Sequence, residues 1–131
     1  MKTLNMQIIV LLVVLAVGLS SFYLRQQNTE NLIIGIWVSE SDSKSKIVFS
    51  NDGKCKEYYD NILEGEYSYI IDNSSPQCET IVPIDVNTNY LQLINVNDAH
   101  DKNCFEINGV TDQKLSLRYL SMGGAIVYDR Q

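Results

Sequence analysis

The sequence predicts an all-β protein, namely a small antiparallel up-and-down β-barrel of eight or nine strands, preceded by a signal or anchor helix. Three observations lead to this fold class. An apolar segment stands near the N-terminus, and short runs rich in Ile, Val, Tyr and Phe recur about every ten residues after it. Gly, Asn, Asp and Ser separate these runs, and no part of the later chain has a sustained helical period.

The N-terminal segment, residues 1–25, has the form of an export signal. Lys2 supplies a basic start, and residues 8–19 are apolar apart from a single glycine. The triplets 16–18 and 19–21 end in small residues and are acceptable cleavage sites for a signal peptide. A single transmembrane anchor is the alternative, because the charge-free stretch approaches the roughly 20 residues that cross a bilayer. The positive charge at the start places the following domain outside the cytoplasmic membrane under both interpretations.

The remaining chain divides into a short polar linker, residues 26–31, and one domain, residues 32–131. The length supports a single folded domain. The formal net charge of −6 comes from interspersed acidic side chains. Nucleic acid and anionic lipid are poor partners for such a surface, because their phosphates require clustered Lys and Arg. The predicted contact with a membrane is therefore limited to the N-terminal segment.

Nine short segments of the domain have strand character. In the fourth, Tyr67, Tyr69 and Ile71 share one face while Glu66 and Ser68 take the other, the alternation of a strand with one face in a core. Asn51, Asp52 and Gly53 form a hairpin signal between the second and third segments, whereas a proline at position 83 marks a strand end or edge. The nine segments are residues 33–39, 45–50, 54–59, 64–72, 78–84, 90–96, 103–108, 114–120 and 125–130.

Consecutive strands with short links form a meander, and a meander must bury its apolar face. Closing into a barrel buries this face and also removes the exposed edges of the sheet. A two-sheet sandwich is the alternative, but an antiparallel meander with tight turns favours the barrel. At this strand number, side chains either fill the interior or leave one small pocket.

The first and last strands carry a family resemblance. Gly35, Ile36 and Trp37 are similar to the Gly-x-Trp element that opens the first strand of lipocalins, and Arg130 stands at the end of the last strand. With the Asp-Gly hairpin and the aromatic strands between them, the chain resembles the small lipocalin-like domains of bacterial envelope proteins, which have a calycin-type barrel. The resemblance implies that Trp37 closes one end of the barrel and that Arg130 packs across it, an arrangement worth roughly 0.5–2 kcal/mol.

A calycin-type barrel also implies an inward-facing lining. The inward positions of the predicted strands carry aromatic and aliphatic residues, and tyrosine suits a pocket because it combines apolar area with a hydroxyl group. The same side chains would fill a barrel this small, so a solid core is the alternative to a pocket. The candidate ligand-binding residues are Phe49, Tyr67, Tyr69, Leu93, Phe105, Leu117 and Tyr119.

Three cysteines follow the export segment, where the compartment is oxidising and two of them are expected to pair. Their spacing alone does not select the pair. Cys78 and Cys104 both stand at predicted strand starts, where a bond could join two loops, and they are the disulfide candidates. Cys55 lies inside a strand on the face of Glu57 and is expected to remain free.

No group of residues predicts catalysis, a metal site or a cofactor. His100 is the only histidine, and it stands among Asn97, Asp98 and Asp101 in a polar turn. Zinc requires three or four converging N or S ligands, and a serine or cysteine nucleophile requires a base held by a third group. We therefore predict a non-enzymatic envelope protein that binds a small apolar or amphipathic ligand. The alternative is a solid-core module that contacts another envelope protein.

Overall fold

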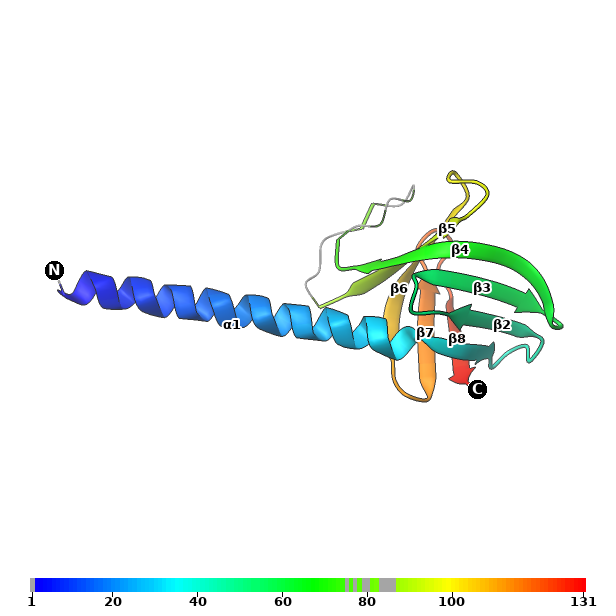
Figure 1. The fold of residues 1–131 in the computed structure, drawn as a ribbon, viewed down its shortest axis with the longest axis horizontal. Helices are drawn as coiled ribbons and strands as arrows, with labels where there is room; N and C mark the ends of the chain where they lie inside the picture. Colours follow the sequence, from blue (N-terminus) through cyan, green and yellow to red (C-terminus); the bar gives the residue numbers. More distant parts are fainter. Residues whose placement is uncertain (1, 75, 77, 79–80, 83–86) are drawn as a thin grey trace.

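The chain forms one long helix that leads into eight consecutive strands (Figure 1). The computed structural model describes residues 2–74, 76, 78, 81–82 and 87–131, and the side chains of all of these except 2–7 and 22–27. The elements are α1 (Lys2–Ile33), β1 (Gly35–Ser39), β2 (Ser45–Phe49), β3 (Lys54–Tyr59), β4 (Ile62–Asp72), β5 (Asn89–Asn95), β6 (Lys102–Val110), β7 (Lys114–Tyr119) and β8 (Ala125–Arg130).

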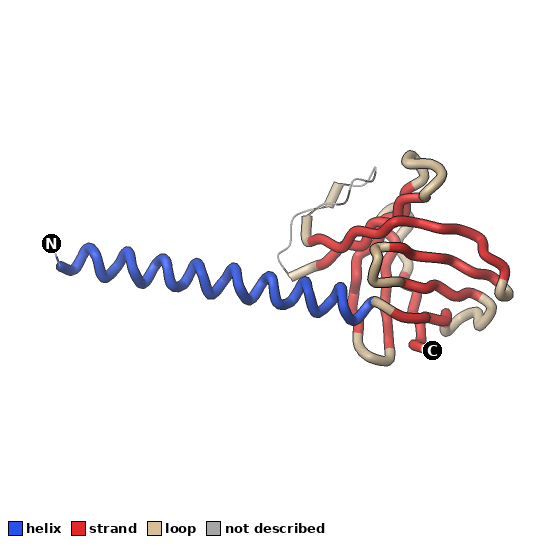
Figure 2. Tube along the Cα trace, in the orientation of Figure 1, coloured by secondary structure: helices blue, strands red, loops and turns tan. Residues whose placement is uncertain are grey.

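The strands form a closed antiparallel barrel in sequence order, as the sequence predicts (Figure 2). Each strand pairs with the next along the chain, and β1 closes the barrel against β8 through Trp37 opposite Arg130 and Ser39 opposite Tyr128. Two register shifts interrupt the ladders, one in β3 after Glu57 and one in β6 after Ile107. Closure leaves no sheet edge to protect, so the sandwich alternative is wrong.

The barrel has eight strands, and the ninth segment predicted at residues 78–84 is not a strand in its described part. Cys78, Ile81 and Val82 lie outside the ladders, whereas residues 79–80 and the predicted edge proline at 83 lie outside the described residues. β4 pairs directly with β5. The physical reason is this direct pairing, because β4 bonds to β3 on one side and to β5 on the other and leaves no place between β4 and β5 for another strand.

The middle of the barrel is filled by large side chains. The inward positions alternate with outward ones along each strand, as period-2 geometry requires. Side chains with less than 2% of their surface exposed come from every strand except β4, β6 and β8, and one of them, Ile33, comes from α1. They are Trp37, Phe49, Ile33, Leu91, Leu93, Leu115, Leu117 and Cys55.

The C-terminal end of α1 closes one end of the barrel. The indole Nε1 of Trp37 donates a hydrogen bond to the carbonyl of Ile33 at 2.7 Å. The guanidinium of Arg130 donates from Nη1 to the carbonyl of Ile34 at 2.8 Å and from Nη2 to the carbonyl of Leu32. These bonds satisfy carbonyls that a helix end leaves without intrahelical partners, and a cation is favourable at that end of the helix dipole.

Arg130 also lies over Trp37, with its guanidinium carbon 4.2 Å from the ring centroid. Gly35 permits this approach, because a Cβ at that position would stand 2.5 Å from Nη1 of Arg130. The φ angle of Gly35 is +144°, a conformation that residues with a side chain rarely adopt. The Gly-x-Trp element and the terminal arginine thus form one unit that joins the helix to the barrel.

The predicted linker at residues 26–31 is helical, and α1 projects from the barrel as a single rod (Figure 1). Its last turns contact the barrel, where Asn89 donates from Nδ2 to the hydroxyl of Thr29 at 3.1 Å. The described side chains of residues 8–21 are exposed. Within the described part of the chain, no helix has the length and apolar character needed to cross a membrane, so the prediction of a transmembrane anchor is not confirmed.

The predicted disulfide between Cys78 and Cys104 is confirmed. It joins the segment after β4 to β6 across a sequence separation of 26 residues. Cys55 is free, as the sequence predicts, and it is buried on the inward face of β3. Structural disulfides persist in oxidising compartments, so this bond indicates an extracytoplasmic environment.

Candidate functional site

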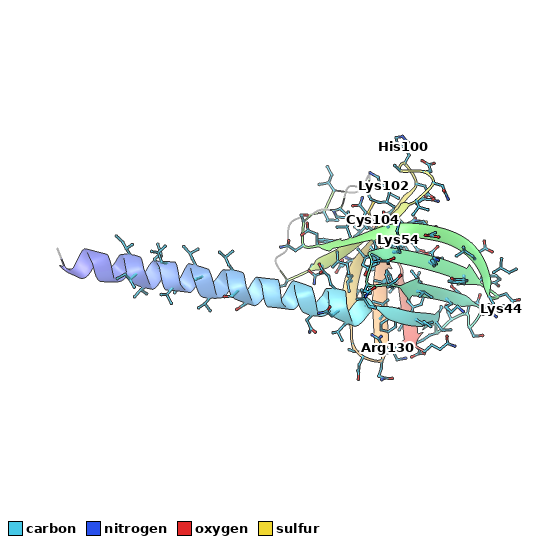
Figure 3. The ribbon with its side chains drawn as sticks, viewed as in Figure 1. Lys44, Lys54, His100, Lys102, Cys104 and Arg130 are labelled. Carbon is cyan, nitrogen blue, oxygen red and sulfur yellow. A yellow bond between two sulfur atoms is a disulfide. The ribbon has the colours of Figure 1, made fainter. Side chains whose placement is uncertain are left out.

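The barrel end opposite α1 is open and forms a cleft of about 400 Å³, which we call the mouth cleft. The loops that border this end are residues 40–44, 60–61, 96–101 and 120–124. Lys44, in the first of these loops, lies far from α1 and marks this end in Figure 3. The wall side chains used below are Ser39, Ile47, Glu57, Tyr119, Ile126 and Tyr128, and the rim includes Asp42, Lys46 and Glu64.

Strand register explains how these wall residues meet. Ile47 pairs with Glu57 across β2 and β3, and Ser39 pairs with Tyr128 across β1 and β8. Paired residues on adjacent strands share one face of the sheet. Glu57 stands two residues after the buried Cys55, so it too projects into the barrel. A carboxyl group therefore lies among apolar and tyrosine side chains at the floor of the cleft.

Glu57 is held in place by a tyrosine and a glycine of β4. The hydroxyl of Tyr67 hydrogen-bonds to the Glu57 carboxyl group. Gly65 is the register partner of Glu57, and a Cβ at Gly65 would lie 2.7 Å from the Tyr67 hydroxyl oxygen and equally close to an edge carbon of the ring. The missing side chain of Gly65 is thus the space in which the Tyr67 ring lies, and this ring position brings the hydroxyl to Glu57.

Burial and a nearby carboxylate alter the acidity of Glu57. Burial raises the pKa of Glu57, and the negative charge of Asp101 raises it further, whereas the Tyr67 hydrogen bond acts in the opposite direction. Asp101 is held near the mouth by Asn95, whose Nδ2 donates to its Oδ2 at 2.8 Å. No lysine or arginine among the described residues forms an ion pair with Glu57.

The tyrosines around the carboxyl group are neutral hydrogen-bonding groups at ordinary pH. Burial, assisted by the charge of Glu57, raises the pKa of Tyr67 to about 12. Burial likewise raises the pKa of Tyr119 and of Tyr128. Burial also raises the pKa of the Cys55 thiol, so that this group is a poor nucleophile. Among the described residues of the cleft wall, Glu57 supplies the one carboxyl group, and the tyrosines beside it and Cys55 stay neutral at ordinary pH.

The rim of the mouth is predominantly acidic. Asp42 and Glu64 contribute carboxylates, and Lys46 contributes the single ammonium group among the residues that line the cleft. That ammonium group is already engaged, since its Nζ lies 5.0 Å from the ring centroid of Tyr58 and donates to Oδ1 of Asn61 at 3.2 Å. The cleft consequently presents negative charge to a ligand.

The structure places the predicted lining residues mainly in the core. Phe49, Tyr67, Leu93, Phe105 and Leu117 are buried, and Tyr69 is partly buried against the same cluster. Phe49 and Tyr69 make an edge contact with ring centroids 5.2 Å apart, and the Tyr69 hydroxyl donates to the carbonyl of Ser50 at 2.9 Å. Of the seven predicted residues, Tyr119 alone lines the mouth cleft.

Sequence reasoning did not select Glu57, Tyr128 or Ser39 as site residues. The sequence does contain a signal for Glu57. It stands two residues after Cys55 and so shares the strand face of Cys55, whereas Lys54 and Lys56 lie on the opposite face. A charged residue in the inward phase of an otherwise apolar lining indicates a site rather than a core position. Tyr128 and Ser39 required the closure of β1 against β8.

Two further clefts flank the last turns of α1. One, of about 430 Å³, is bordered by Glu30, Ile34 and Tyr69, and the other, of about 250 Å³, by Thr29, Leu32 and Asn89. Both lie beside the helix where it closes the barrel and outside the core.

The predicted polar turn around His100 has a structural role. Asn95 accepts from the backbone N–H of Asn97 at 2.9 Å, and Asp98 accepts from the backbone N–H of His100 at 2.9 Å. His100 itself is exposed at the tip of the β5–β6 loop (Figure 3). Among the described residues, no three side chains of His, Cys, Asp and Glu converge as a metal site.

We expect the buried carboxyl group of Glu57 to lower the stability of the folded chain when it is ionised. Because its pKa is raised in the folded chain, the folded state binds more protons than the unfolded state between the ordinary glutamate pKa of about 4.3 and the raised value. The contribution of Glu57 to stability is therefore greatest below this interval and falls as the pH rises through it. Glu57→Gln retains an acceptor for Tyr67 and removes the buried charge, so we expect it to raise the free energy of unfolding at pH 7 on the order of 1 kcal/mol.

Urea melts of both chains between pH 4 and pH 8 measure this effect. The difference between wild type and Glu57→Gln isolates one carboxyl group from the others that titrate in the same range. Glu66→Gln is the matched control, because Glu66 lies on the outer face of β4 beside Lys56. A difference between wild type and Glu57→Gln that does not change with pH would contradict the raised pKa.

Comparison with known proteins yields no relative. No protein-family model matches the chain, and neither a curated protein nor a solved structure is significantly similar to it. The closed antiparallel barrel of eight strands is consistent with a calycin-like fold.

Proposed function

We propose that this protein is an exported, non-enzymatic binding module that holds a small amphipathic molecule in the mouth cleft. One observation carries the proposal, namely the half-buried carboxyl group of Glu57 at the floor of an open cleft of about 400 Å³. A carboxyl group in this position disfavours folding when ionised. Ligand pockets occupy about 300–1,000 Å³, and this cleft has such a volume with a mixed lining of tyrosine, isoleucine, serine and charged side chains.

The composition of the cleft supports binding rather than catalysis. The groups next to Glu57 are tyrosines and a buried thiol, all with raised pKa values. General acid–base catalysis benefits from a second group that titrates near the working pH, and neither the tyrosines nor Cys55 supplies it. The arrangement suits hydrogen bonding and charge pairing with a bound molecule.

The disulfide and the N-terminal segment support export. Lys2 precedes the apolar run, and the Cys78–Cys104 bond is of a kind that forms and persists in oxidising compartments. Cleavage after Gly18 or Ser21 would remove most of the exposed residues of α1 and keep Thr29 and Ile33, which contact the barrel. The resemblance to small lipocalin-like envelope domains agrees with this location.

A solid-core interaction module is the second candidate, and the filled middle of the barrel favours it. Eight large side chains with less than 2% exposure lie between the mouth and the end of α1. In this case the loops or the acidic outer face would contact another envelope protein. The two candidates differ in whether the mouth cleft is occupied in the cell.

Native mass spectrometry of the chain purified from its own host tests the proposal. We expect a co-purifying small molecule with the wild type and its loss in Ile126→Trp, because this substitution fills the mouth cleft. Val127→Trp is the matched control, since Val127 lies on the outer face of the same strand opposite Ser116. A wild-type chain without a bound molecule would overturn the binding proposal and favour the interaction module.

A further inference from the structure

The mouth cleft has the charge and the surfaces of a site for a positively charged molecule. Glu57 is the one charged side chain on its inner wall among the described residues, and Asp42 and Glu64 add carboxylates at the rim. Asp101 lies close enough to raise the pKa of Glu57 further. Lys46 contributes an ammonium group to the rim as well, but this group is already engaged by the Tyr58 ring and by Asn61. An anionic molecule would therefore meet repulsion at the rim and on the floor.

The rings that line the cleft favour a cation as well. Tyr119 and Tyr128 stand on the wall and Tyr59 contributes to the opening, whereas the Tyr58 ring already interacts with the Lys46 ammonium group. The faces of aromatic rings attract ammonium groups, and quaternary ammonium ligands are recognised by several such rings together. A carboxylate beside aromatic walls is thus a combination suited to an organic cation with an apolar part.

The carboxylate is also held in position before any ligand arrives. The Tyr67 hydroxyl hydrogen-bonds to Glu57, and the Tyr67 ring occupies the space beside Gly65. Tyr67 is buried with 8% of its surface exposed, so its ring has little freedom to move. A preorganised acceptor reduces the ordering cost of binding.

We propose that the mouth cleft selects a small organic cation, an amine or a quaternary ammonium compound, with the Glu57 carboxylate as its counter-ion. This inference rests on the proposed binding function and narrows it to one class of ligand. The positive group of the ligand replaces the hydration that Glu57 loses on burial, and its apolar part contacts Ile47 and Ile126. The free-energy cost of burying the Glu57 carboxylate is thereby offset in the complex.

Affinity for a permanently charged ligand is expected to rise with pH. A cation binds the ionised form of Glu57, so binding strengthens as Glu57 loses its proton across its raised pKa. The titratable and charged groups that face Glu57 are Cys55 on β3, Tyr67 on β4, Asp101 on the β5–β6 loop, Tyr119 on β7 and Tyr128 on β8, with Asp42, Lys46 and Glu64 at the rim. The Glu57→Gln variant separates the contribution of Glu57 from all of these.

Three probes of matched shape test the selectivity. Benzyltrimethylammonium is the cation, neopentylbenzene is its neutral carbon isostere, and phenylmethanesulfonate is the anion. Ligand-observed NMR titrations of the full chain at pH 8 are expected to show binding of the cation about ten- to a hundredfold tighter than of the neutral isostere. The anion is expected to bind more weakly than both.

Two variants test whether the preference for the cationic probe depends on Glu57. Glu57→Gln is expected to reduce the affinity for the cation about ten- to a hundredfold and to abolish its pH dependence, with little effect on the neutral probe. Glu66→Gln changes the same charge on the outer face and is expected to bind the cation as the wild type does. Cation binding that is equal in wild type and Glu57→Gln would overturn the inference.

The probes also separate this inference from the proposed function. If the neutral isostere binds in the cleft as tightly as the cation, the binding function stands and the charge selectivity is wrong. If no probe binds the wild type and Ile126→Trp changes nothing, both are wrong. Binding of the cation with loss in Glu57→Gln supports both.

Discussion

Replacing Trp37 by alanine is expected to lower the free energy of unfolding by about 3–5 kcal/mol. Trp37 is fully buried and is among the largest side chains of the core. Its loss leaves a cavity next to Ile33 and removes the Nε1 hydrogen bond to the Ile33 carbonyl. It also removes the ring beneath the Arg130 guanidinium, which then caps the helix without its aromatic support.

Denaturant melts of the full chain measure this loss, with Trp37→Phe as the comparison. Phenylalanine keeps an aromatic ring beneath Arg130 and removes the indole N–H, so it should destabilise the protein less than alanine does. A loss below about 1 kcal/mol for Trp37→Ala would fall outside the range for truncated core aromatics. It would show that the helix end does not depend on Trp37 for its contact with the barrel.

Breaking the disulfide is the second large effect that we expect. Cys78→Ser should lower the free energy of unfolding by about 3–4 kcal/mol, because the bond closes a loop of 26 residues in the unfolded chain. The loop contains β5, which pairs with both β4 and β6, so the bond restricts a segment that must find two partners.

The wild type in the presence and absence of a reductant provides the control for this variant. Reduction should lower the wild-type stability to that of Cys78→Ser and leave the variant unchanged. Cys55 is buried and has no disulfide partner, so its thiol should not contribute to the difference. Equal stability of the oxidised wild type and Cys78→Ser would contradict the role assigned to the bond.

Much of the barrel follows from local patterns in the sequence. The alternation of Tyr67, Tyr69 and Ile71 with polar residues predicts β4, and Asp52 with Gly53 predicts the turn between β2 and β3. The disulfide pair was also predicted, from two cysteines at expected strand starts. These features depend on neighbouring residues, and sequence patterns report such short-range preferences well.

The candidate site was harder to predict from the sequence than the strands were. The predicted lining followed the aromatic and aliphatic residues, and the structure uses most of them to fill the core. The open end lies instead where Glu57 interrupts the apolar lining. The number of strands was ambiguous for a related reason. Residues 78–84 have the sequence pattern of a strand, and only the direct pairing of β4 with β5 leaves no place for another strand between them.

The sequence by itself determined the apolar N-terminal segment, the strand alternation and the Gly-x-Trp element. Tertiary structure alone decided three things. These are the closure at eight strands, the contact of Arg130 with the carbonyls of Leu32 and Ile34 at the end of α1, and the opening of the cleft around Glu57. The physical reason is that side-chain alternation has a period of two residues and can be read locally. Which distant strands meet, and which polar group faces the opening, depends on register and closure across the whole chain.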